Sequence, residues 1–354
     1  MKRRDRLSPG LASLVLVAWM TTLAGAAIHE VPVLSSAALK ESSQDGRVFV
    51  GGVRRQDEIV VVDTRMLCGS CDPESLRSGL RVETYAAYEE VGCRRWQPSD
   101  LESFLAFDAS VPTIVFVHGN QVTASDAKQA GLTLYRRMMQ YGGDGPPIRL
   151  VIFSWPSAQV GGLLRDVRVK AARTGPAGCQ LAWLLDQMPA ETPISLVGFS
   201  FGARIITGGL HILAGGSLGH LALPQRVHPA RPPMNVVLLS AALHAHWLGE
   251  GQYHGLAMSR VNQMLLVNNC RDPALRLYHL AFKGGRPQAL GLRGPTCLSF
   301  EQRSKIQMRD VSRHVSRHVL FQYLCAPGVP AQIREYSTDG MHGGIQVAIA
   351  NRAD

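Results

Sequence analysis

The stretch Val197-Gly198-Phe199-Ser200-Phe201-Gly202-Ala203 decides the fold. The apolar residues 193–197 are typical of a short buried strand, and residues 201–213 are typical of a helix. The Gly-x-Ser-x-Gly motif therefore stands at a strand-to-helix turn. A turn this sharp requires residues with almost no side chain two positions either side of the serine, and Gly198 and Gly202 meet that need. The turn exposes the Ser200 hydroxyl at a helix N-terminus, where backbone N–H groups point toward developing negative charge. Ser200 is therefore the candidate nucleophile; the alternative is a glycine-rich turn with an incidental serine.

A second apolar strand, residues 112–117, ends in His118-Gly119-Asn120. With this strand and the serine turn, the chain resembles the α/β-hydrolase superfamily, in particular a bacterial branch with Phe-Val-His-Gly-Asn and Ser-Trp-Pro-Ser blocks. The resemblance runs from about residue 112 to residue 324. It implies that backbone N–H groups of Phe201 and of Asn120 or Gln121 form an oxyanion hole. His118 is expected to orient this turn by hydrogen bonding rather than to act as a base.

Apolar strands alternate with helical stretches, which predicts an α/β fold: a mostly parallel sheet with helices on both faces. Further strands are expected at 148–153, 235–240, 263–267 and 305–311, and helices at 125–141 and 167–188, the second with a break at Gly175-Pro176. A strand-containing N-terminal extension precedes them, with strands at 58–64 and 80–88 and a short helix from Trp96 to Leu105. Ser99 is the expected N-cap of that helix, with Glu102 closing a capping box.

A serine hydroxyl is a weak nucleophile that needs a base, and the base needs an orienting acid. In the α/β-hydrolase fold these groups follow in the order serine, acid, histidine, each after a strand. Asp272 is the candidate acid, although an Asp-Pro pair also caps a helix; Asp310 is the reserve. Two histidines follow the last strand: His318 is the candidate base by its placement, and His314 is the alternative.

Some further side chains have two open interpretations. His244 and His246 are candidates for substrate contact. An apolar acyl pocket or ordinary packing would equally account for Trp247, Tyr253 and Leu256. Packing or surface roles are expected for His211 and His220.

The N-terminus has the layout of a signal peptide. Four basic residues within residues 1–6 precede an uncharged run from Leu7 to Ile28, and Ala24-Gly25-Ala26 is a small-x-small cleavage site. The expected organisation is a signal peptide at 1–26, a linker at 27–54, a hydrolase domain at 55–326 with its extension at 55–110, and a C-terminal tail at 327–354. An exported protein is predicted. The alternative is an uncleaved membrane anchor, because the uncharged run is long enough to span a bilayer.

Seven cysteines include the motif Cys68-Gly-Ser-Cys71. In an exported protein, structural disulfides or inert thiols are favoured over a zinc site or a redox motif, since no second cysteine pair lies nearby. The formal net charge of +10 is scattered, with no basic stripe interleaved with aromatic residues, so nucleic-acid binding is not expected. The mechanism requires no metal and no cofactor.

The predicted function is that of a serine hydrolase, by default an esterase or lipase, acting on a small-molecule or lipid ester, a thioester or an amide. The alternative is a non-catalytic binding or scaffold protein on the same fold, because common folds host unrelated functions. A third possibility is a thiol oxidoreductase built on Cys68 and Cys71.

Overall fold

The computed structural model describes residues 49–50, 52–67, 69–88, 93–140, 145–224, 231–282 and 285–339. The expected signal peptide and most of the expected linker lie outside these residues. No helix in the described part of the chain is both long enough and apolar enough to cross a membrane.

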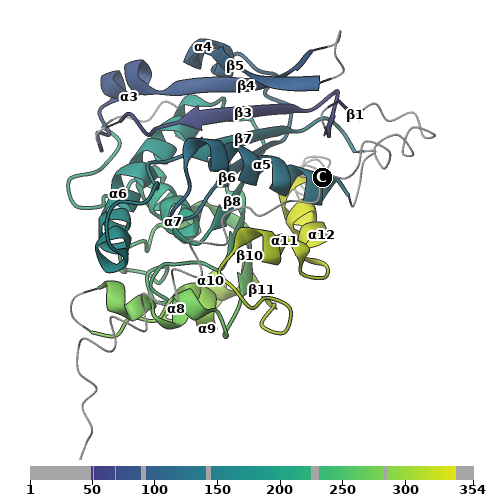
Figure 1. Ribbon diagram of the computed structural model, residues 1–354. Coiled ribbons are helices and arrows are strands. Elements are labelled where there is room, and N and C mark those ends of the chain that lie inside the picture. Colours follow the sequence, from purple (N-terminus) through teal and green to yellow (C-terminus); the bar gives the residue numbers. More distant parts are fainter. Residues whose placement is uncertain are drawn as a thin grey trace, which may run out of the picture.

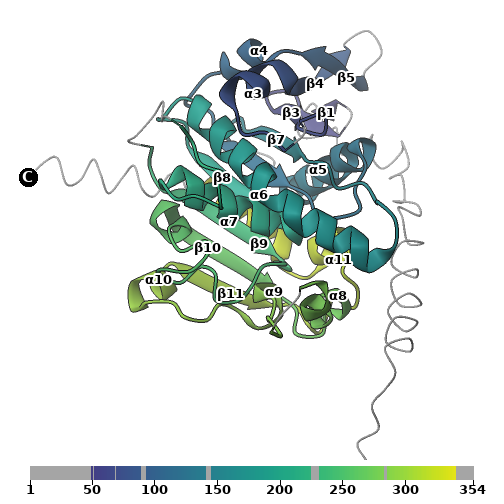
Figure 2. The same ribbon diagram turned by 90° about the vertical axis from the view of Figure 1, so that its left-hand side faces the viewer.

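A nine-stranded sheet forms the centre of the molecule, with strand order β11-β10-β9-β8-β6-β7-β3-β4-β5 (Figures 1 and 2). Neighbouring strands pair in parallel from β11 to β3, and β4 and β5 add an antiparallel edge. The carboxyl ends of the parallel strands therefore meet along one edge of the sheet. The strands are β3 (Glu58–Asp63), β4 (Arg81–Tyr88), β5 (Cys93–Ser99), β6 (Thr113–Val117), β7 (Arg149–Ser154), β8 (Ile194–Phe199), β9 (Met234–Leu239), β10 (Val261–Asn268) and β11 (Ile306–Asp310).

Helices cover both faces of this sheet, as predicted. One face packs against α6 (Leu163–Gln187) and α7 (Phe201–Leu213). The other packs against α5 (Ala124–Met139), α11 (Leu320–Cys325) and α12 (Val329–Arg334), as Figure 1 shows. The central strands β6, β7, β8 and β9 are buried along their whole length. This double coverage explains why their sequences are nearly continuous apolar runs rather than alternating patterns.

Shorter helical segments connect these elements. They are α3 (Pro73–Gly79), α4 (Leu101–Leu105), η3 (Ala257–Arg260), α8 (Pro273–Arg276), η4 (Tyr278–Ala281), α9 (Leu290–Arg293), α10 (Phe300–Ser304) and η5 (Glu335–Asp339).

Helix α6 runs unbroken through Gly175-Pro176, where the sequence predicted a break. Its neighbour α7 lies so close that a Cβ on Gly178 would sit 3.2 Å from the backbone nitrogen of Gly209. A Cβ on Gly209 would in turn lie 2.9 Å from the Gly178 carbonyl oxygen. A proline removes one helical hydrogen bond, but the tight packing of α6 on α7 stabilises the helical conformation on both sides of Pro176.

The antiparallel edge corrects two expectations. Residues 93–99 form strand β5 instead of opening a helix at Trp96, and Pro98 is accommodated because β5 is an edge strand. Helix α4 is capped by Asp100, whose carboxylate accepts from the Ser103 N–H at 2.7 Å, and not by Ser99. Ser99 remains in the ladder, paired with Val82.

Ordered structure extends beyond both expected limits of the hydrolase domain. Strands β1 (Phe49–Val50) and β2 (Val53–Arg54) form a small hairpin inside the expected linker, and Val53 is fully buried. At the other end, α12 and η5 continue the fold into the expected tail. Val329 and Ile333 are fully buried in the same core as α5, so this segment is part of the packed unit up to Asp339.

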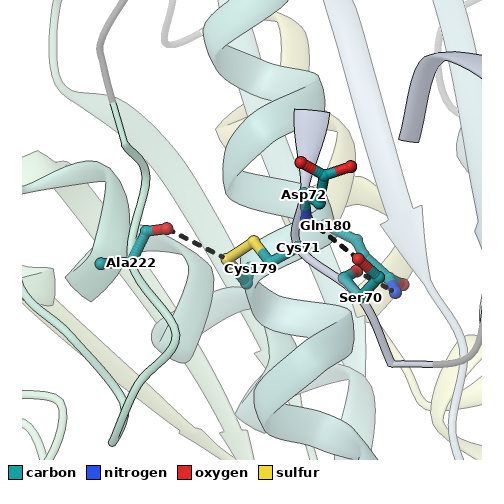
Figure 3. The surroundings of a disulfide bond; sticks show 6 residues. All are labelled: Ser70, Cys71, Asp72, Cys179, Gln180 and Ala222. Atoms are coloured by element: carbon teal, nitrogen blue, oxygen red, sulfur yellow. Dashed lines mark hydrogen bonds between the residues drawn. A yellow bond between two sulfur atoms is a disulfide. The ribbon is translucent and has the colours of Figure 1, made fainter. Parts of the chain in front are cut away.

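A disulfide joins Cys71 to Cys179 across 108 residues (Figure 3). It ties the segment before α3 to the middle of α6, and the Gln180 side chain adds a hydrogen bond to the Ser70 carbonyl at 3.1 Å. The structural disulfide expected of these cysteines is thus present, with Cys179 as the partner of Cys71. Cys68 lies outside the described residues. The free thiols of Cys270, Cys297 and Cys325 are exposed and that of Cys93 is partly buried.

Loss of this crosslink should destabilise the protein. In the chain-entropy account, a loop of this length contributes about 4–5 kcal/mol to the free energy of unfolding. We expect Cys179→Ser to lower that free energy by about 2–5 kcal/mol in urea denaturation under non-reducing conditions. Cys325→Ser, which removes an exposed free thiol, is the control. Equal stability of the two variants would show that the crosslink contributes nothing.

Candidate active site

Ser200 lies between β8 and α7 in a strained backbone conformation, with φ +54° and ψ −117°. The two glycines of the motif permit it. A Cβ on Gly202 would stand 2.0 Å from the Val117 carbonyl oxygen, and one on Gly198 would stand 2.8 Å from the Ala203 nitrogen. The turn therefore fits only when both positions lack a side chain, which is the requirement inferred from the sequence.

Ser200, His318 and Asp272 form a continuous chain of hydrogen bonds. Nε2 of His318 lies 2.7 Å from Oγ of Ser200, and Nδ1 of the same ring lies 2.7 Å from Oδ2 of Asp272. When the ring carries its proton on Nδ1, it donates to Asp272 and accepts from the Ser200 hydroxyl. The three side chains come from the ends of β8 and β10 and from the segment after β11, so they meet at the carboxyl edge of the sheet.

The Asp272 carboxylate is fully buried and hydrogen-bonded at both oxygens. Ser240 and Tyr323 each donate a hydroxyl to Oδ2 at 2.7 Å. The N–H groups of Ala274 and Leu275 donate to Oδ1 at 3.0 Å, so Asp272 also caps α8. Burial raises the pKa of Asp272, but the interaction with His318 and these hydrogen bonds outweigh burial and hold the pKa well below its usual range. Asp272 therefore caps α8 with one carboxylate oxygen and bonds to His318 with the other, so the two interpretations of this residue are compatible.

The alternative acid and base lie apart from this chain. His314 is exposed, and its ring makes no hydrogen bond to another described residue. The Asp310 carboxylate accepts from the hydroxyl and the N–H of Ser312. The structure thus brings together His318 and Asp272 rather than their two alternatives.

His118 is buried and fixes the turn that follows β6. Its Nδ1–H donates to the Gly119 carbonyl at 2.9 Å, and its Nε2 accepts from the Trp155 N–H and the Arg65 guanidinium, both at 3.3 Å. Burial, with a smaller effect of the Arg65 charge, lowers the pKa of His118 to about 3. A neutral ring is needed for this donor and acceptor pattern. His118 therefore has the turn-orienting contacts that were expected of it.

The turn at residues 119–122 is held against both Ser200 and the Ser-Trp-Pro-Ser block. A Cβ on Gly119 would lie 3.2 Å from the Cβ of Ser200, so the backbone here passes directly beside the serine. The Gln121 N–H donates to the Ser157 carbonyl at 2.9 Å. This bond occupies the donor and excludes Gln121 from the oxyanion hole expected of it.

Two expected oxyanion donors remain. The Asn120 N–H has no hydrogen-bond partner among the described residues. Phe201 is the first residue of α7, so its N–H has no helical carbonyl to bond.

A buried ion pair positions Asn120. Its side-chain amide donates to Oδ2 of Asp166 at 2.9 Å, and Oδ1 of Asp166 accepts from Lys170 at 3.0 Å. Asp166 and Lys170 are both fully buried, one turn apart on α6. Removing one partner would leave an uncompensated buried charge, so this pair anchors the turn firmly.

Ser240, Tyr323 and the Asp166–Lys170 pair were not identified from the sequence. Ser240 directly follows β9 at the edge that carries Ser200, and this placement was a usable signal. Tyr323 stands in a His-x4-Tyr-Leu pattern after His318, but nothing in the pattern indicates that its hydroxyl reaches the acid. The ion pair looks like part of a basic solvent-facing helix in the sequence, because the burial of one face depends on packing.

The side chains proposed for substrate contact gather near this edge. His244 stacks on Trp247 at 4.3 Å between ring centroids, His246 contacts His244 at 5.7 Å, and Tyr253 packs on Trp247 at 4.6 Å. His211 is buried and accepts from the Leu256 N–H, which is the packing role expected of it. His220 is exposed. Within the described residues, no group of three or more His, Cys, Asp or Glu side chains is arranged to hold a metal ion.

The described features together define the α/β-hydrolase fold. The sheet is mostly parallel, the serine occupies a strained strand-to-helix turn, and serine, aspartate and histidine follow in that order at the carboxyl ends of strands. Chemically, such an arrangement can transfer the serine proton to the imidazole while the carboxylate stabilises the imidazolium.

Comparisons with known proteins give remote likenesses. No protein-family model matches the sequence, and no match is found among curated proteins. Among solved structures, Zea mays acyl-protein thioesterase 2 is 16% identical with a TM-score of 0.36, over 66% of this chain and 94% of that one. Lactobacillus rhamnosis esterase B, inhibited by a C4-C4 tributyrin phosphonate, is 13% identical with a TM-score of 0.40, over 98% and 100%. The catalytic core of Trichoderma reesei acetyl xylan esterase is 12% identical with a TM-score of 0.37, over 67% and 99%.

Two histidines with a lowered pKa should make stability depend on pH. Burial lowers the pKa of His118 to about 3 and that of His244 to about 4, whereas in the unfolded chain both titrate near pH ~6.5. The unfolded state therefore binds more protons between these values, and stability falls as the pH drops below about 6.5. His118→Gln should reduce the pH slope of the unfolding free energy in urea titrations by up to about 1.4 kcal/mol per pH unit.

The exposed His314 provides the control for this prediction: the slope change in His118→Gln should exceed that in His314→Gln, because His118 is buried and His314 is exposed. An identical slope in the His118 variant and the unmodified protein would contradict the neutral, buried assignment of His118.

Proposed function

We propose that the protein is a serine hydrolase that cleaves carboxylic esters through an acyl-enzyme. The observation that carries the proposal is the chain of two 2.7 Å hydrogen bonds linking Ser200, His318 and Asp272. Esters are the favoured substrates because they need the least assistance to the leaving group; thioesters and amides are the harder members of the same class.

In this mechanism Ser200 Oγ attacks the carbonyl carbon while His318 Nε2 takes the hydroxyl proton. The Asp272 carboxylate, which its low pKa keeps ionised, stabilises the imidazolium that results. The N–H groups of Phe201 and Asn120 bind the oxyanion of the tetrahedral intermediate. His318 then returns the proton to the leaving alcohol. Water attacks the acyl-enzyme by the same sequence of steps and releases the acid.

The alternative function is a binding or scaffold protein that keeps the fold without the chemistry. The strained φ of Ser200 favours catalysis, because sparsely populated backbone conformations cluster at functional sites. A fluorophosphonate probe distinguishes the two, since it labels only an activated serine. A thiol oxidoreductase is a weaker candidate, because Cys71 is bonded to Cys179 rather than to Cys68.

Three variants test the proposed catalytic residues. Ser200→Ala and His318→Ala should each lower kcat for a 4-nitrophenyl ester by about 10⁴-fold or more, and the double variant should lose little beyond either, because these residues act as a unit. His314→Ala is the matched control and should retain full activity. Unchanged hydrolysis by Ser200→Ala would reject the proposal, whereas loss of activity in His314→Ala alone would reassign the base.

We also propose that the protein is exported. The proposal rests on the basic start, the uncharged run and the Ala24-Gly25-Ala26 site, and is supported by the Cys71–Cys179 disulfide, because disulfides persist in oxidising compartments.

Intact-mass measurement of the protein from its native host should show cleavage after Ala26, with Ala27 as the new N-terminus. A full-length chain in the membrane fraction would instead indicate the uncleaved anchor. A full-length chain in the cytosol would contradict both.

A further inference from the structure

Arg204 lies on α7 four residues after Ser200. At a rise of about 1.5 Å per residue, this separates the two residues by about 6 Å along the helix axis. Helical side chains generally slant toward the N-terminus of their helix, which in α7 is the end that follows Ser200.

Aromatic side chains surround this guanidinium. Its central carbon lies 4.5 Å from the centre of the Trp247 ring and 5.5 Å from that of Phe282. Tyr278 interacts with Arg204 and packs on Phe282 at 4.8 Å. These rings come from the segments that follow β9 and β10, which also carry Ser240 and Asp272. The cluster and the proposed catalytic groups are therefore built on the same chain segments.

The positive charge of Arg204 has no counter-charge within the described part of the chain. None of the ion pairs there involves Arg204, and its Nη1 is buried without a hydrogen-bond partner. Burial lowers the pKa of Arg204, and the Arg204 charge in turn helps to lower the pKa of His244 to about 4. Cation–π contacts and a side-chain hydrogen bond with Tyr278 offset part of the cost of burying a cation, but they leave Nη1 of the guanidinium unsatisfied.

We propose that Arg204 binds an oxyanion carried by the substrate, so that the preferred ester bears a carboxylate or phosphate close to its scissile bond. This inference rests on the proposed ester hydrolysis and specifies its substrate class. An arginine side chain matches both anions because its fork of N–H donors can engage two oxygens at once. The aromatic neighbours contact the guanidinium and leave its Nη1 for the ligand. Trp247 of this cluster packs on Tyr253, which is 47 % exposed, so the cluster reaches the surface of the protein.

Pairs of esters that differ only in charge test the proposal. One pair, 3-carboxyphenyl butyrate and 3-carbamoylphenyl butyrate, carries the anion on the leaving group. A second pair, mono-4-nitrophenyl adipate and its methyl ester, carries it on the acyl group. A third ester, 3-(phosphonooxy)phenyl butyrate, tests whether the anion is a phosphate rather than a carboxylate; its neutral partner is again 3-carbamoylphenyl butyrate. The measured quantity is the ratio of kcat/KM for the anionic ester to that for its neutral partner.

The unmodified protein should prefer the anionic ester in at least one comparison, and Arg204→Gln should lower that ratio by about 30-fold or more. Arg276→Gln removes an exposed positive charge on α8 at the same edge, and should leave the ratio unchanged. If the Gln variant fails to fold, Arg204→Lys carries the test: it keeps the charge, loses the two-pronged geometry and should lower the ratio by several fold.

Equal ratios in the unmodified protein and the Arg204 variants, with the neutral esters still hydrolysed, would overturn the anion site and leave the hydrolase proposal intact. Inactivity toward every ester would instead contradict the proposed function. Binding then decides the anion site, because calorimetric titration of 3-carboxyphenyl butyrate into Ser200→Ala needs no turnover. Tight binding lost in the Ser200→Ala/Arg204→Gln variant would support the site, and binding unaffected by the Arg204 change would reject it.

Discussion

The fully buried carboxylate of Asp272 joins the parts of the candidate site. It accepts hydrogen bonds from Ser240 at the end of β9, from His318 and Tyr323 after β11, and from two N–H groups of the helix that it caps. An isolated charge would be costly at such depth, so the carboxylate is stable only with this set of donors in place. The same bonds that compensate its burial fix the orientation of the His318 ring toward Ser200.

The turn after β6, which carries Asn120, is held by a separate set of contacts. His118 and the Ser-Trp-Pro-Ser block secure the turn after β6 from one side, and the Asp166–Lys170 pair secures Asn120 from the other. None of these contacts involves Ser200. The Asn120 N–H, which is proposed to bind the oxyanion, is thus positioned before any substrate arrives, which is the arrangement that makes such stabilisation effective.

Backbone strain is concentrated at this edge of the sheet. Gln121, Ser200 and Ser240 adopt positive φ without being glycine, and each directly follows or closely follows the end of a parallel strand. Their conformations cost energy that the surrounding core must supply. The core can do so because the central strands are buried on both faces. The Cys71–Cys179 disulfide adds a covalent link between the N-terminal extension and α6.

The sequence by itself determined the class of fold and the candidates for the central groups. Glycines around Ser200, apolar runs long enough for buried strands, and an aspartate and a histidine after later strands are local features, so they can be read without the structure. Tertiary structure decided what depends on close approach between distant segments. In the folded chain His318, and not His314, lies next to Ser200, and the Gln121 N–H is bonded to Ser157. Helix α6 continues past Pro176, and residues 93–99 form an edge strand. Tertiary packing also buried Asp166 and Lys170 and placed Arg204 against aromatic rings, because whether a charged helical residue faces solvent or core depends on the elements that pack against it.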